Sequence, residues 1–161
     1  MFRRNRAFAV LLSVALGACD VDFLIVGPGL VAVGGTELHL RPIAPFPQSI
    51  PIPTCPGVQP FVARFEVTIG GARIDHNLER MDVWFSDRRG AAGPTVTLGS
   101  ADIARQFGSN TVAAGRSLIL VMTHGFGCGT LASGTVFVFV RLRDANGAMH
   151  SMRQELSTEG P

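Results

Sequence analysis

The chain has 161 residues, of which 47% are hydrophobic and 16% are charged, with a formal net charge of +2. This length is typical of one domain and allows a hydrophobic core to form without a structural metal. Beyond Arg6 the basic residues form no cluster, so a nucleic-acid partner is not expected.

Residues 1–18 have the pattern of an export signal. Arg3, Arg4 and Arg6 form a positive head, residues 7–15 are apolar, and small residues then lead up to Cys19. Only about 12 residues of this segment are apolar, whereas about 20 are needed to cross a bilayer. The pattern therefore predicts a cleaved signal rather than a transmembrane anchor.

The sequence Leu16-Gly17-Ala18-Cys19 resembles the lipobox of bacterial lipoproteins. The resemblance implies that a diacylglycerol is attached to the sulfur of Cys19, that cleavage makes Cys19 the N-terminus, and that its amine often gains a further acyl chain such as palmitate. Two or three acyl chains anchor a protein stably to a membrane. The implied location is the cell envelope, facing the periplasm. Asp20 resembles an inner-membrane retention signal, and the outer membrane is the alternative.

Removal of residues 1–18 changes both the charge and the cysteine count of the mature domain, residues 19–161. Eleven arginines against 12 acidic residues give a net charge of −1. Cys55 and Cys128 remain as a pair, which in an oxidising compartment predicts a disulfide bond. A reactive thiol at Cys128 beside His124 is the alternative, but no third group that would orient the base can be identified.

The first half of the mature domain predicts short strands. Residues 23–35 are apolar with a glycine-proline bend, and residues 36–41 alternate as a half-buried strand does. Residues 42–60 hold seven of the ten prolines and predict an extended segment that the disulfide would hold to the domain. Residues 61–69 alternate clearly, and Gly70-Gly71 predicts a hairpin that places Ile69 opposite Ala72.

The second half adds further strands and one short helix. Strands are predicted at residues 81–86, 95–98 and 149–156, the last entered through a hairpin turn at residues 144–147. Residues 100–107 predict a helix that Gly108 ends. The sequence as a whole predicts one antiparallel β-sandwich domain, immunoglobulin-like or partly closed into a barrel, with seven or eight strands.

Two further strands, residues 118–122 and 136–142, are apolar on both faces. This pattern predicts central strands with both surfaces covered. Residues 23–33 or the proline-rich segment could supply the cover and make Phe137 and Phe139 part of the core. Alternatively, Phe137 and Phe139 belong to an exposed patch that binds a partner or lipid, or the strands line an internal ligand cavity.

Candidate metal ligands are sparse in the sequence. His39, His76, His124 and His150 lie on different segments without the close spacing of a zinc site. Residues 149–152 are more suggestive, because thioether and imidazole together select copper(I). His150-Ser151-Met152, with Met149 beside it, resembles the histidine-any-methionine unit of envelope copper carriers, although the upstream histidine-methionine pair of that family is missing. Methionines that alternate on a strand are otherwise core residues, and Trp84 is expected in the core as well.

The sequence therefore predicts a membrane-tethered binding or assembly module whose partner is an unidentified envelope protein. No nucleophile motif, phosphate-binding loop or catalytic carboxylate pair is recognisable, so neither an enzyme nor a bound cofactor is expected. The alternatives are a periplasmic copper-binding protein and an unrecognised envelope enzyme.

Overall fold

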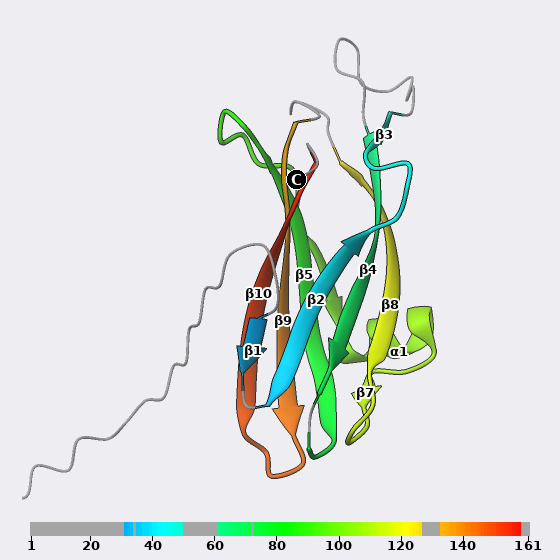
Figure 1. Cartoon of the computed structure of the whole chain (residues 1–161), viewed down its shortest axis with the longest axis vertical. Coiled ribbons are helices and arrows are strands. Elements are labelled where there is room, and N and C mark those ends of the chain that lie inside the picture. Colours follow the sequence, from blue (N-terminus) through cyan, green and yellow to red (C-terminus); the bar gives the residue numbers. More distant parts are fainter. Residues whose placement is uncertain (1–30, 34, 50–60, 72, 127–132, 159–161) are drawn as a thin grey trace, which may run out of the picture.

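The structure of the chain is a computed structural model, and it describes residues 31–33, 35–49, 61–71, 73–126 and 133–158. Within these ranges ten strands and one helix form two antiparallel sheets that pack face to face (Figure 1). The predicted all-β sandwich is confirmed, and the sheets do not close into a barrel. Three of the strands have only two or three residues, which leaves seven longer ones.

The first sheet has the order β1-β2-β4-β3, with β8 paired to the other edge of β4. Its strands are β1 (Val31–Val33), β2 (Thr36–Pro42), β3 (Gln48–Ser49), β4 (Phe61–Gly70) and β8 (Leu118–Phe126). β4 pairs with β8 from Phe61 opposite Phe126 to Ile69 opposite Leu118. β4 is therefore the central strand of this sheet.

The second sheet has the order β10-β9-β5-β6, with β7 also paired to β5. Its strands are β5 (His76–Asp87), β6 (Val96–Gly99), β7 (Thr111–Val112), β9 (Gly134–Asp144) and β10 (Met149–Ser157). The helix α1 (Ser100–Phe107) has the predicted bounds; it connects β6 to β7 and buries Ile103. No helix in the described part of the chain is long and apolar enough to span a bilayer.

The order of the seven longer strands is that of an immunoglobulin-like sandwich. β2, β4 and β8 take the places of strands A, B and E, and β6, β5, β9 and β10 take those of C′, C, F and G. The core lies between these sheets and is built from the alternate, inward-facing residues of each strand. Phe65 of β4 and Phe85 of β5 are fully buried there.

The predicted hairpin at Gly70-Gly71 is wrong. β5 begins at His76 and pairs with β9, β6 and β7 in the second sheet, so the chain crosses between sheets after β4. β4 has no edge left for β5, because β2 and β3 occupy one edge and β8 the other. Ile74, which a hairpin with Ile69 opposite Ala72 would place opposite Val67, is exposed in the crossover.

β5 contains an irregularity that decides which of its residues face the core. Met81, Val83 and Phe85 face inward, and strict alternation would continue this face to residues 79 and 77. The register against β9 shifts between Leu78 and Arg80, so Leu78 and His76 face inward instead. The bulge thus places an imidazole at the inner face of the sandwich.

The prediction of two covered faces is wrong for β8. Among the described residues β8 pairs only with β4, and Ile119 and Val121 on its outer face are 56% and 43% exposed. β9 does lie centrally, between β10 and β5. Its outward residues Phe137 and Phe139 are half-buried. Apolarity on both faces therefore marks a central strand in one case and an edge strand in the other.

Candidate functional site

Three of the predicted functional residues, Cys19, Cys55 and Cys128, lie outside the described residues. The described strand ends nearest to the last two are register partners, because Phe61 opens β4 opposite Phe126 at the end of β8. Cys55 precedes Phe61 by six residues and Cys128 follows Phe126 by two.

The residues of the predicted copper unit are divided between the two faces of β10. Met149 is 44% exposed, whereas its neighbour His150 lies on the inner face, because successive strand residues point to opposite sides. Met152 shares the inner face with His150 but is a buried core residue, 2% exposed. Met149 and His150 thus do not project together as a copper(I) unit would require.

The outer face of the second sheet carries an aromatic cluster that crosses three strands. Trp84 of β5 and Phe137 of β9 are register partners, and their rings stack at a centroid distance of 5.1 Å and an interplanar angle of 13°. The guanidinium of Arg153 on β10 lies 4.6 Å from the Phe137 ring and 5.6 Å from the Trp84 ring. We call Trp84, Phe137, Phe139 and Arg153 the outer aromatic surface.

Charged groups border this surface in a fixed arrangement. Asp82, the register partner of Phe139, accepts hydrogen bonds from the Arg80 Nε at 2.8 Å and from the Thr97 hydroxyl at 2.6 Å. Arg153 donates to Glu155 at 2.8 Å, which holds its guanidinium over the rings. The expectation that Trp84 lies in the core is wrong, because its side chain is half-buried on the outer face of β5. The half-buried rings form an amphipathic surface with organised donors.

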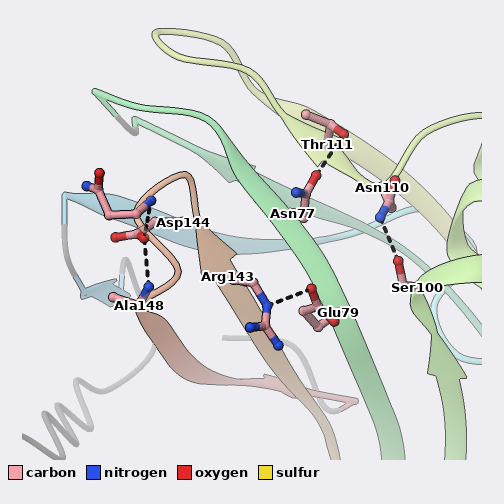
Figure 2. Close-up of polar contacts among 9 residues, drawn as sticks. Asn77, Glu79, Ser100, Asn110, Thr111, Arg143, Asp144 and Ala148 are labelled. Atoms are coloured by element: carbon pink, nitrogen blue, oxygen red, sulfur yellow. Dashed lines mark hydrogen bonds and ion pairs between the residues drawn. The ribbon is translucent and has the colours of Figure 1, made fainter.

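A second cluster of polar residues lies at the hairpin between β9 and β10, at the end of the sandwich opposite to Phe61. Asp144 closes β9, and its Oδ1 accepts the backbone amides of Asn146 at 2.9 Å and Ala148 at 2.8 Å, as Figure 2 shows for Ala148. Gly147 supplies the positive φ of 87° that the turn requires. This geometry confirms the predicted turn at residues 144–147 and assigns one carboxylate oxygen to it.

The other oxygen of Asp144 faces a histidine. Its Oδ2 lies 3.2 Å from the Nε2 of His150, the second residue of β10. The hydrogen bond from His150 lowers the pKa of Asp144, the amides of Ala148 and Asn146 lower it further, and burial opposes them. The carboxylate is therefore ionised near neutral pH.

His76 completes this group from the neighbouring strand. It is the register partner of Asp144 and is 1% exposed. The rings of His76 and His150 have centroids 5.4 Å apart. One ligand atom from each of His76, Asp144 and His150 lies within 4.8 Å of the others, and these three are the residues of the described chain that could together hold a metal ion.

The other two histidines do not join this group. His39 is exposed on β2. His124 of β8 packs edge-on against Phe126 at a centroid distance of 4.5 Å, and burial lowers its pKa. The spacing of the four histidines in the sequence therefore does not indicate that His76 and His150 lie close together. The only local signal for it was the break in alternation between Leu78 and Met81, which places His76 inside.

Comparison with known proteins reveals similarity in fold. No family model and no curated protein matches the chain. The structure is similar to that of target SoR45 of the Northeast Structural Genomics Consortium, with a TM-score of 0.57, 10% identity, and coverage of 81% of this chain and 91% of that one. A protein from Bordetella pertussis assigned the name ApaA is 14% identical, with a TM-score of 0.48 and coverage of 78% and 95%. The first likeness shows the fold.

Proposed function

We propose that this chain is a lipid-anchored envelope protein that binds a protein partner through its outer aromatic surface. The observation that supports this most directly is the stack of Trp84 on Phe137 with Arg153 above it, on the outward face of the second sheet. Tryptophan and arginine are enriched among the residues that dominate protein–protein binding energy, and aromatic residues are enriched in interfaces.

The geometry of the surface favours binding because its side chains are already ordered. Trp84 and Phe137 fix each other by stacking, and Glu155 fixes Arg153. A partner would therefore lose little rotamer entropy on this side of the interface. The pairing of arginine with aromatic rings also offers both apolar area and donors to a partner that carries carboxylates or carbonyls.

The anchoring part of the proposal rests on the sequence. Residues 3–18 have the order of a lipoprotein signal, and Cys19 follows it as the acyl acceptor. A tether at the bilayer raises the effective concentration of the domain near other envelope proteins. Asp20 makes the inner membrane the preferred location within this proposal.

The anchor is tested by Cys19→Ala in the full chain expressed in bacteria. We expect the wild type to incorporate a labelled fatty acid and to sediment with membranes, and the variant to lose both properties. Fractionation and acyl labelling measure the two outcomes. Unchanged membrane recovery of Cys19→Ala, without acyl label in either protein, would contradict the lipid anchor.

The binding surface is tested by the double variant Phe137→Ser/Phe139→Ser. We expect crosslinking in native cells followed by mass spectrometry to lose the partner of the wild type, while the thermal unfolding temperature falls by only a few degrees. The matched control is Ile119→Ser/Val121→Ser, which removes two exposed apolar side chains from the other sheet and should keep the partner.

Two results would overturn this part of the proposal. Recovery of the same crosslinked proteins by the Phe137→Ser/Phe139→Ser variant would exclude the surface as the interface. A heavy loss of thermal stability, equal to that caused by truncating a buried core residue, would show instead that the two phenylalanines serve the core.

A further inference from the structure

The end of the sandwich formed by the β9–β10 hairpin brings together two imidazoles and a carboxylate from three adjacent strands. His76 opens β5, Asp144 closes β9 and His150 lies at the start of β10. All three face the inside of the sandwich, where the start of β2 contributes the buried Thr36. This end is the lower one in Figure 1, where β9 finishes and β2, β5 and β10 begin.

The hydrogen bonds of His76 place its proton on Nδ1 and leave the Nε2 lone pair as an acceptor for the Thr36 hydroxyl. Its Nδ1 lies 2.9 Å from the carbonyl oxygen of Ile74, and because a carbonyl only accepts, Nδ1 carries the proton. Metal-binding histidines are commonly oriented by this kind of bond to a backbone carbonyl. The Nε2 is approached by the Thr36 hydroxyl at 3.4 Å, which is at the long limit for a hydrogen bond.

Asp144 and His150 have the separation that a tetrahedral ion imposes on its ligands. Bonds of about 2.0–2.1 Å place neighbouring ligands about 3.3 Å apart in such a site. The His150 Nε2 and the Asp144 Oδ2 are 3.2 Å apart. The Asp144 Oδ1 meanwhile remains bound to the turn amides of Asn146 and Ala148, so the carboxylate is already oriented.

One ligand atom from each of the three residues lies within 4.8 Å of the other two, so small side-chain rotations would bring all three residues to bonding distance of one ion. The side chains of Asp144 and His150 are 9% and 19% exposed, whereas His76 is buried. An ion would thus enter from the hairpin side and keep a coordination position open to water.

We propose that His76, Asp144 and His150 bind one divalent transition-metal ion, and that zinc is the ion they fit best. Two imidazole nitrogens and one carboxylate oxygen are ligands that zinc accepts, and three protein ligands with an open position characterise reactive rather than purely structural sites. Binding uses the Nε2 lone pair of His150, so the single proton of that neutral imidazole moves to Nδ1, and the Nε2–Oδ2 hydrogen bond is replaced by two metal bonds.

The proposal is tested with zinc alone on the full chain, purified in detergent micelles without reductant and stripped with a chelator. We expect isothermal titration calorimetry to give one zinc per chain with about micromolar affinity or tighter, and zinc to raise the unfolding temperature. Elemental analysis after gel filtration checks the stoichiometry. The absence of zinc uptake at concentrations well above micromolar would overturn the proposal.

Two variants that preserve the local structure locate the ion. Asp144→Asn keeps an oxygen acceptor for the turn amides but removes the charge, and His150→Gln alters a half-buried position. Each should weaken zinc binding by at least about tenfold and remove the thermal shift, with the metal-free proteins unfolding close to the wild type. His39→Ala is the matched control, since His39 is exposed on β2, and it should bind as the wild type does. If both site variants bind zinc with the affinity of the wild type, zinc binds elsewhere, for example at cysteine.

Discussion

Leu120→Ala should lower the free energy of unfolding by about 2 to 5 kcal/mol, whereas Ile119→Ala should lower it by less than about 1 kcal/mol. The two residues are neighbours on β8 and have side chains of equal carbon number. Leu120 is fully buried in the core beside Val67, and Ile119 is 56% exposed beside Thr68. The difference arises because alanine leaves a cavity at position 120 and only removes a partly hydrated side chain at position 119.

Chemical denaturation of the full chain, monitored by circular dichroism, measures both free energies. The comparison is informative because the sequence of β8 is apolar on both faces. Similar losses for the two variants would mean that the outer face of β8 is covered, and would contradict its placement as an edge strand with one exposed face.

Reduction of a Cys55–Cys128 disulfide should lower the free energy of unfolding by up to about 4 kcal/mol. The bond would close a loop of about 70 residues, and in the chain-entropy model such a loop costs the unfolded state that much conformational freedom. Both cysteines lie outside the described residues; among those described, Phe61, which follows Cys55 in sequence, and Phe126, which precedes Cys128, are register partners.

Thermal unfolding with and without reductant measures this effect, and peptide mass spectrometry under non-reducing conditions identifies the bond. The Cys55→Ser/Cys128→Ser variant provides the control, because its unfolding temperature should equal that of the reduced wild type and should not respond to reductant. Free thiols at both positions in protein secreted to the periplasm would exclude the disulfide.

The lipoprotein signal and the disulfide remain predictions from the sequence, and their residues lie outside the described part of the chain. The sequence predicts only part of the outer aromatic surface. It indicates Phe137 and Phe139 as candidates for an exposed patch, but it favours a core position for Trp84. Trp84 lies on the outer face because the alternate residues Met81, Val83 and Phe85 of β5 face the core.

Most strands and the helix can be located from local sequence patterns. Alternation of apolar residues predicts β4 and β2, and the turn residues between Asp144 and Gly147 predict the final hairpin. These patterns indicate which side of a strand is buried, since burial repeats every second residue. They do not indicate which other strand lies beside it.

The neighbours of each strand depend on long-range contacts. β4 pairs with β2 and β8 and not with β5, the next long strand in the chain. β5 instead lies in the other sheet and pairs with β9, which follows it by some sixty residues. The same pairing, with the bulge in β5, brings His76 within reach of Asp144 and His150. Such long-range contacts depend on the joint packing of two sheets around one core, so no local pattern in the chain encodes them alone.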